Sequence, residues 1–214
     1  MAQRVGPAGE VVGVDVDAAL GAQALDMLHA AGHRQCAFAP LDLETGDPIP
    51  GAPFDLVYAR LLLFHVADPT SVLRRLWDAV APGGQLLVHD YDLRGIDVTP
   101  SLDTVADWRR VVLGAFNGAG RDIQVGHTLP VLFAGAGLGA PDGTDVAGRL
   151  EPLRAGGPML AAVFTSLTPA AESLGLLGPG EAERWQAAFA GDVRDRGDHA
   201  LLWPLLIGAW KRRE

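Results

Sequence analysis

The chain has 214 residues, a net charge of −9 and a hydrophobic fraction of 49%. This length and composition are those of a globular domain with a sizeable core, and they exclude a disordered chain. An acidic chain also lacks the basic surface that non-specific binding to nucleic acid or to an anionic membrane requires, so neither partner is expected.

A single cysteine, Cys36, lies inside an apolar run. It cannot form an intrachain disulfide, and its position predicts a buried thiol in a reducing compartment. No apolar run reaches the ~20 residues of a membrane span, and the first residues lack the apolar core of a signal peptide. We therefore predict a cytoplasmic protein.

The first part of the chain alternates short apolar runs with an amphipathic segment. Residues 10–14 predict a strand, and Asp17 follows it as the N-cap of a helix that ends at Gly32. Residues 35–39 predict the next strand. Residues 41–53 are rich in glycine and proline and predict a loop.

Residues 54–92 predict a βαβ unit. A strand over 56–59 is followed by a helix with Asp68 as its N-cap and Pro69 at its first position, where the missing N–H costs nothing. A turn at 82–84 then leads into a strand over 85–88. Two buried runs joined by a helix are typical of a parallel crossover. The expected buried stripe of that helix is Val72, Leu73, Leu76 and Val80.

The second half predicts helices over 104–116, 159–171 and 181–190, and strands over 144–150 and 201–210. A short helix is expected from Pro130 to about Gly137, with Thr128 as its cap. Pro204 predicts a gap in the hydrogen-bond ladder of the final strand. Alternating strands and helices predict one α/β domain with a mostly parallel sheet.

Ligands of such sheets bind beyond the carboxyl ends of the strands. Asp15 follows one strand and could accept hydrogen bonds from a ribose diol, or it could merely cap the next helix. Asp42 follows another strand and could accept a hydrogen bond from an amine, or it could be a solvated loop acid. Two further strands are followed in the same way, one by Arg60 and the other by residues 89–92.

Residues 89–92 read His-Asp-Tyr-Asp, in which the histidine could act as a general base. The two acids could bind a divalent ion, but no third ligand has a suggestive spacing, and we predict no metal site. Arg121 and His127 lie in a glycine-rich loop and could face a substrate or solvent. Trp108 lies on a helix face of the kind that usually packs into a core.

Several of these segments resemble class I S-adenosylmethionine-dependent methyltransferases, in particular those with a small-molecule acceptor. The most specific combination is Phe54-Asp55-Leu56-Val57, His65 with Asp68-Pro69, and Pro82-Gly83-Gly84. Residues 5–15 are similar to the run into the second strand of that family. The likeness continues more loosely through 126–138 to a closing strand at 207–210, so it covers nearly the whole chain.

The resemblance implies a Rossmann-like three-layer sandwich, with a mostly parallel sheet and an antiparallel final strand. It also implies that 1–214 form a single domain, in which residues 93–137 and 151–195 are helical segments that cover the acceptor. The family's first strand and the glycine-rich loop after it have no counterpart here. The domain is therefore expected to be N-terminally incomplete, with the first strand missing.

The activity implied is methyl transfer from S-adenosylmethionine to an O, N or C nucleophile of a small molecule. The resemblance implies cofactor contacts for six residues: Asp15, Val16, Asp42, Leu43, Ala59 and Arg60. It implies acceptor contacts for Tyr91, Trp108 and Arg121, while His89, Asp90 and His127 are candidates for a general base.

The missing loop leaves alternatives open. The chain could be a shortened version of a longer enzyme, a partner chain could supply the strand, or the domain could be non-catalytic and bind the cofactor weakly or only with a partner. A homodimer is also open. A nicotinamide-dependent dehydrogenase shares the acid after a strand, but it too requires the absent glycine fingerprint.

Overall fold

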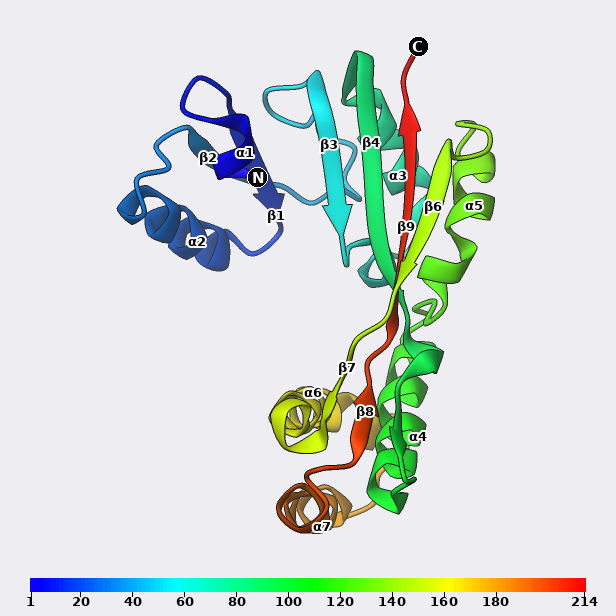
Figure 1. The fold of residues 1–214 in the computed structure, drawn as a ribbon. Helices are drawn as coiled ribbons and strands as arrows, with labels where there is room; N and C mark the ends of the chain where they lie inside the picture. Colours follow the sequence, from blue (N-terminus) through cyan, green and yellow to red (C-terminus); the bar gives the residue numbers. More distant parts are fainter.

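The computed structural model describes all 214 residues, which form an upper part built on β-sheet and a lower helical lobe (Figure 1). The strands are β1 (Val11–Asp15), β2 (Cys36–Pro40), β3 (Phe54–Arg60), β4 (Val80–Asp92), β5 (Asp97–Thr99), β6 (Gly143–Ala147), β7 (Leu150–Pro152), β8 (Ala200–Leu202) and β9 (Leu205–Arg212). The helices are α1 (Ala2–Val5), α2 (Ala18–Ala30), α3 (Pro69–Asp78), α4 (Asp103–Gly118), α5 (Val125–Gly135), α6 (Leu153–Ser173) and α7 (Glu181–Asp195).

The main sheet has the strand order β3-β4-β9-β6. β3 and β4 are parallel, whereas β9 runs antiparallel to both of its neighbours, so β6 points the same way as β4. β1 and β2 form a separate parallel pair, and β1 points in the same direction as β3 (Figure 1). The predicted Rossmann-like α/β fold, with an antiparallel final strand, is confirmed. The sheet is interrupted between β1 and β3.

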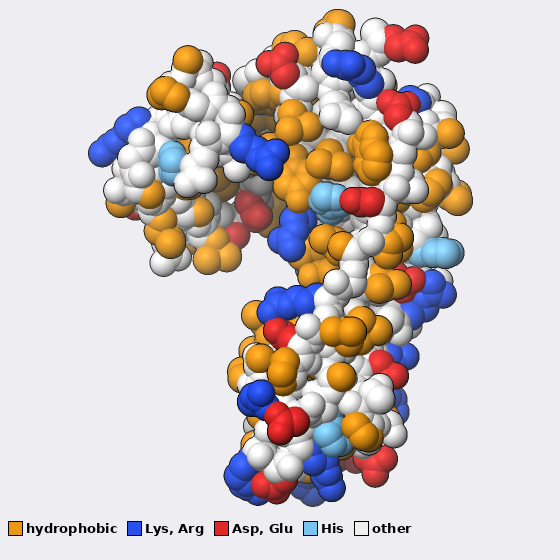
Figure 2. Space-filling model, viewed as in Figure 1, with side chains coloured by type: hydrophobic (Ala, Val, Ile, Leu, Met, Phe, Trp, Pro, Cys, Tyr) orange, Lys and Arg blue, Asp and Glu red, His pale blue; other side chains and the backbone are white.

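One face of the main sheet is covered, and the other is open. Helices α3 and α5 pack on the covered face and enclose a core whose fully buried members include Leu73, Leu86 and Phe133. On the opposite face Leu56 and Tyr58 keep 43% and 36% of their surface exposed. Figure 2 shows apolar side chains gathered over these strands. An apolar sheet face of this kind is normally buried against another element.

Helix α2 packs on β2 through its smallest residue. Gly21 lies against the ring of Phe38 so closely that a Cβ there would overlap the ring. The apolar residues that predicted an amphipathic helix are mostly turned away from the sheet, since Leu20 and Met27 are 63% and 69% exposed. The helix was predicted, but its apolar stripe is open to solvent.

The lower lobe is built on a second sheet, β5-β8-β7, with α4, α6 and α7 packed around it. It has its own hydrophobic core. The ring of Trp185 stacks on Phe164, with centroids 3.8 Å apart, and on Phe189 at 4.7 Å. The lobe is connected to the main sheet at the carboxyl end of β4. It therefore lies beside the edge where a Rossmann-like sheet binds its ligands (Figure 1).

Two helix starts agree with the sequence. The Asp17 carboxylate accepts the N–H groups of Ala19 and Leu20 at the start of α2. The Asp68 carboxylate accepts the N–H of Ser71 at 3.0 Å at the start of α3, and Pro69 is the first helical residue. A side-chain acceptor followed by a helix former is a local signal, so the sequence alone is sufficient here.

Other boundaries were wrong. Val80 is buried in β4, not in the preceding helix, because Phe54 pairs with it across a bulge that contains 82–84. Helix α5 starts at Val125 and Thr128 lies inside it, hydrogen-bonded to the Val125 carbonyl. The strand expected over 144–150 divides into β6 and β7, which belong to different sheets. The final strand also divides, at Pro204, where the gap was expected.

Gly126 lets α5 approach the carboxyl end of β4. A Cβ at this position would lie 2.5 Å from the Asp90 carbonyl oxygen and 2.9 Å from the Tyr91 carbonyl carbon. These are backbone atoms of a central strand, so Gly126→Ala would force the helix outward. We expect the free energy of unfolding to fall by about 1–3 kcal/mol in urea titrations.

Gly135 is the matched control, since it lies on the same helix and its added Cβ would only touch Thr70 at 3.8 Å. Gly135→Ala should leave stability unchanged or raise it by up to about 1 kcal/mol. Equal losses in the two variants would contradict the close approach of α5 to β4.

Candidate functional site

Two carboxylates stand at the carboxyl ends of β1 and β2. Asp15 ends β1, and its Oδ1 accepts the N–H of Asp17 at 2.9 Å. Asp42 follows β2, and its Oδ1 accepts the N–H of Glu44 at 2.8 Å. The Asp15 carbonyl accepts the N–H of Leu41 at 2.9 Å, which ties the two strand ends together. In each carboxylate, Oδ2 accepts no hydrogen bond from the chain.

This geometry decides between the two roles considered for Asp15, a ligand contact and the cap of the next helix. Because Asp17 caps α2, Asp15 only shapes the turn before the helix and keeps one oxygen available. Val16, between them, is 69% exposed. The other expected contact residues differ: the side chains of Leu43 and Ala59 are buried in the main core, whereas Arg60 is exposed at the end of β3.

The chain turns sharply after β3. Leu61 has a φ of +53°, a left-handed conformation that costs a non-glycine residue about 1 kcal/mol or more. The turn is held from below by Asp90, which is completely buried. Its Oδ2 accepts the N–H of Leu63 at 2.8 Å, and its Oδ1 accepts its neighbour's N–H, that of Tyr91, at 3.0 Å. Asp90 therefore supports the site and is not placed to act as its general base.

Burial raises the pKa of Asp90 to about 6, against the opposing effect of its backbone donors. The folded chain thus binds this proton more tightly than the unfolded chain, whose aspartates titrate near about 3.9. The stabilising contribution is present below about pH 4 and is lost as the pH rises through 6. We expect the stability of the protein relative to Asp90→Asn to fall by about 2 kcal/mol from pH 4 to pH 7.

Urea titrations of both proteins across this range measure the difference directly. Asp122→Asn is a useful control, because Asp122 is exposed and its Oδ1 accepts only the N–H of Gln124, at 2.8 Å. A constant difference between the protein and Asp90→Asn would contradict the raised pKa.

The charges of two residues from distant segments act on His65. Its pKa is lowered, chiefly by burial and secondly by the positive charge of Arg121, while the negative charge of Asp15 opposes the shift. The imidazole is therefore neutral at pH 7 and able to accept a proton. The fold thus brings together the end of β1, the turn after β3 and the loop after α4.

His89 lies elsewhere, on the open face of the main sheet. Its Nδ1 is 3.1 Å from the Tyr58 hydroxyl, and its Nε2 is 3.8 Å from Oδ1 of Asp145 on β6. The two rings meet edge to face, with centroids 5.6 Å apart. This cluster faces away from the core side of the strands.

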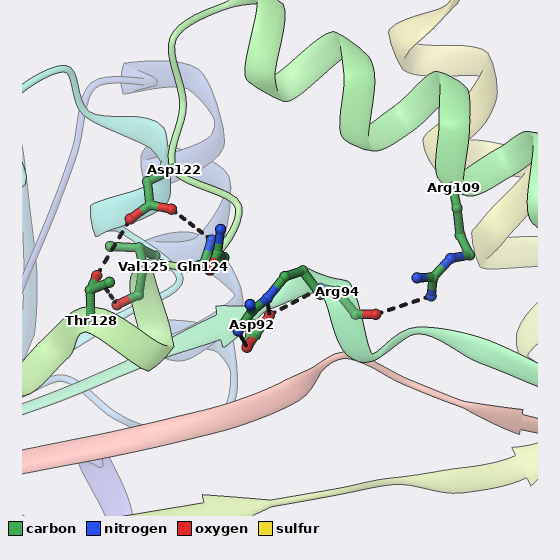
Figure 3. A network of polar contacts seen from close by, with 7 residues as sticks. All are labelled: Asp92, Arg94, Arg109, Asp122, Gln124, Val125 and Thr128. Atoms are coloured by element: carbon green, nitrogen blue, oxygen red, sulfur yellow. Dashed lines mark hydrogen bonds and ion pairs between the residues drawn. The ribbon is translucent and has the colours of Figure 1, made fainter.

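A polar network joins the sheet to the helical lobe (Figure 3). Asp92 accepts hydrogen bonds from Arg94, including Nε at 2.9 Å, and these hold the pKa of Asp92 below its usual range. The Arg94 carbonyl in turn accepts a hydrogen bond from Nη1 of Arg109 on α4, at 3.0 Å. His127 is exposed and close enough to Asp92 to lower its pKa further. The network fixes where the lobe leaves β4.

The three expected acceptor residues are separated. Trp108 is buried in the core of the lobe and donates its Nε1–H to the Leu160 carbonyl at 2.8 Å, so the expectation that it contacts the acceptor is wrong. Tyr91 is half-buried on β4 opposite Leu206. Only Arg121 lies near the carboxylate edge.

The two segments expected to cover the acceptor, 93–137 and 151–195, lie only partly in the same lobe. Helices α4, α6 and α7 share the lower lobe, but α5, within 93–137, packs on the main sheet against β4 and β9. No pattern in the sequence distinguishes α5 from the other three helices, since all four carry apolar stripes. It also missed His65 as a site residue, and its position in an apolar segment is the usual signal of a core histidine.

None of the helices combines the length and the hydropathy that a membrane crossing requires. Residues 1–86 match a family model described as a methyltransferase domain. A solved structure from Bacillus halodurans that carries a methyltransferase assignment superposes with a TM-score of 0.58 at 17% identity, over 95% of this chain and 83% of its own. The first two fifths of the chain are thus similar to a methyltransferase domain, and the chain as a whole has the fold of that solved structure.

Two curated relatives align with parts of this chain. Methyltransferase str2 of Strobilurus tenacellus is 44% identical over 59 residues, which are 26% of this chain and 22% of the relative. The trans-aconitate 2-methyltransferase of Paracidovorax citrulli is 36% identical over 88 residues, 41% of this chain and 32% of the relative. The matched region thus spans about a fifth to a third of the length of these relatives.

Proposed function

We propose that the chain carries out methyl transfer from S-adenosylmethionine to an O, N or C nucleophile of a small molecule. The observation that carries the proposal is the pair of carboxylates, Asp15 and Asp42, on adjacent strand ends, each with one oxygen left free. Hydroxyl and amine donors are the natural partners of such oxygens.

The residues at this edge fit one side of the cofactor. Asp15 would hold the ribose hydroxyls, with Val16 beside it, and Asp42 would accept a hydrogen bond from the adenine amine. The Arg60 guanidinium, exposed at the end of β3, suits the carboxylate of the methionine part. The buried side chains of Leu43 and Ala59 would shape the floor from below.

When bound, S-adenosylmethionine supplies a methyl group activated by its sulfonium. The chain's part is to orient the acceptor and exclude water. The helical lobe beside the edge would cover the acceptor, with Arg121 nearest to it. His65, neutral and exposed at the turn after β3, could accept a proton released by an acceptor group.

The relatives favour a small molecule as acceptor, since one of them is named for methylation of trans-aconitate. The cytoplasmic location and the homodimer expected from the sequence stay predictions.

A second candidate is a domain that binds the cofactor only when a further strand joins it. The interruption of the sheet between β1 and β3 favours this version, because it leaves the facing edges of these two strands unpaired. Both candidates share the same cofactor edge.

Equilibrium dialysis against S-adenosylmethionine, S-adenosylhomocysteine and NAD tests the proposal. We expect retention of the two sulfur compounds and none of NAD. Preference for NAD would overturn the proposal in favour of a dehydrogenase.

A further inference from the structure

Residues 42–45 form the turn after β2 and carry Asp42, the proposed partner of the adenine amine. Oδ1 of Asp42 accepts the N–H of Glu44 at 2.8 Å, and the Asp42 carbonyl accepts the hydroxyl of Thr45 at 2.9 Å. The turn contains no helix or strand residue. Short turns of this kind open easily unless the rest of the chain holds them. The position of the Asp42 carboxylate therefore depends on contacts from other elements.

Arg75 on α3 makes one of these contacts. Its Nη1 donates a hydrogen bond to the Leu43 carbonyl at 2.7 Å and a longer one to the Asp42 carbonyl at 3.4 Å. Arg75 lies 32 residues from Leu43 in the sequence. The side chain of Leu43 is buried in the core that α3 helps to enclose. The turn is thus attached to α3 both through its backbone and through an apolar side chain.

The guanidinium of Arg75 is partly withdrawn from water. Its Nη2 is buried and has no hydrogen-bond partner in the chain. A buried charged donor costs free energy unless its other contacts compensate. Here the compensation comes from the two carbonyls of the turn, because a hydrogen bond from a charged donor is stronger than one from a neutral donor. Arg75 is therefore built into the structure at this turn, unlike an arginine that extends into solvent.

Glu44 makes a second contact between the turn and α3. Its Oε1 accepts the N–H of Ala67 at 2.7 Å. Ala67 directly precedes Asp68, the N-cap of α3. The turn is thus held near both ends of α3, which packs on the main sheet. These contacts fix where Asp42 lies relative to Arg60, the exposed residue at the end of β3.

We propose that Arg75 is a positioning residue for the cofactor, which holds Asp42 in place and so makes the site selective for the adenine amine. The proposal rests on the proposed function and deepens it. Both hydrogen bonds of Arg75 go to backbone carbonyls, so Oδ2 of Asp42 stays available to the ligand. An ionised carboxylate only accepts hydrogen bonds, so it favours a base that carries an amine over one that carries a carbonyl at the same position.

The test compares the affinities for S-adenosylhomocysteine and S-inosylhomocysteine, in which a carbonyl replaces the amine. We expect the unchanged chain to prefer the adenosine compound by a factor of about 10. In Arg75→Met the preference should fall to about threefold or less, because the affinity for the adenosine compound falls and that for the inosine compound does not. A general loss of structure would lower both affinities, so their ratio separates a positioning role from a merely structural one.

Arg74→Met is the matched control. Arg74 is the neighbour of Arg75 on α3 and also donates to two carbonyls, but these belong to Ala136 at 3.1 Å and Gly135 at 3.4 Å, at the end of α5. This variant loses the same charge and should keep its preference within about twofold of the unchanged chain. Arg75→Lys keeps a charged donor, so its preference should lie between those of the unchanged chain and Arg75→Met. Urea titrations confirm that each variant is folded.

Amide hydrogen exchange tests the positioning without any cofactor. The N–H of Glu44 bonds to the carboxylate of Asp42, and the N–H of Thr45 bonds to its carbonyl. Both should exchange faster in Arg75→Met by a factor of about 5, the equivalent of one lost hydrogen bond. Their exchange in Arg74→Met should match that of the unchanged chain.

The proposal is overturned if Arg75→Met keeps the full preference, if Arg74→Met loses it equally, or if exchange at Glu44 and Thr45 does not change. The methyl-transfer assignment survives each of these results. If the unchanged chain binds neither compound, the proposed function falls and the selectivity falls with it, whereas faster exchange in Arg75→Met would still show that Arg75 holds the turn.

Discussion

Asp15→Ala is expected to weaken binding of S-adenosylmethionine by a factor of about 10 to 100. A hydrogen bond to a charged group contributes about 1.5–3 kcal/mol, and each 1.4 kcal/mol is about tenfold in affinity. The loss should appear in binding and not in stability. The carboxylate is exposed, and within the chain its side chain accepts only the N–H of Asp17.

Asp17→Asn is the matched control for this prediction. The two acids are two residues apart, but both hydrogen bonds that the Asp17 side chain accepts come from the start of α2. An asparagine keeps the cap, so the affinity should stay within about twofold. If Asp17→Asn loses as much affinity as Asp15→Ala, the ribose contact is wrongly placed.

Phe164→Ala is expected to lower the free energy of unfolding by about 3–5 kcal/mol. The ring is completely buried in α6 and stacks on Trp185 at 3.8 Å and 11°. Its removal leaves a cavity between α4, α6 and α7, whose core is separate from that of the main sheet. Urea titration followed by tryptophan fluorescence measures the change.

Met159 lies on the same helix and is 57% exposed, so Met159→Ala should change stability by less than about 0.5 kcal/mol. A small effect of Phe164→Ala would contradict the well-packed core of the lobe.

The strand ends that carry the proposed site could be predicted from the sequence. An acid after each apolar run placed Asp15 and Asp42 on one edge, because parallel strands end on the same side. Asp17 and Asp68 were predictable for a similar reason, since each cap is a contact between residues three or fewer apart.

Contacts between residues far apart in the sequence determine the positions of the site residues that the sequence did not predict. Asp90 reads as a strand-end acid, yet the turn after β3 lies over it and makes it a buried support. Trp108 and Arg121 both follow the βαβ unit, but Trp108 is buried in the lobe's core, whereas the charge of Arg121 lowers the pKa of His65. No local pattern distinguishes these outcomes. The division of 201–210 at Pro204 was visible because proline acts locally.

The missing strand was expected from the resemblance, but its consequence required the structure. β1 and β2 stay folded as a separate pair, and the space beside them remains a groove with two free edges. Leu20 and Met27 on α2 and Leu56 and Tyr58 on β3 each keep a third or more of their surface exposed.

The most direct test of the central claim is a calorimetric titration of the chain with S-adenosylmethionine. We predict saturable binding of one cofactor per chain, and its loss by a factor of about 10 or more in Asp15→Ala. Absence of binding at millimolar cofactor would contradict the assignment of this edge as a cofactor site.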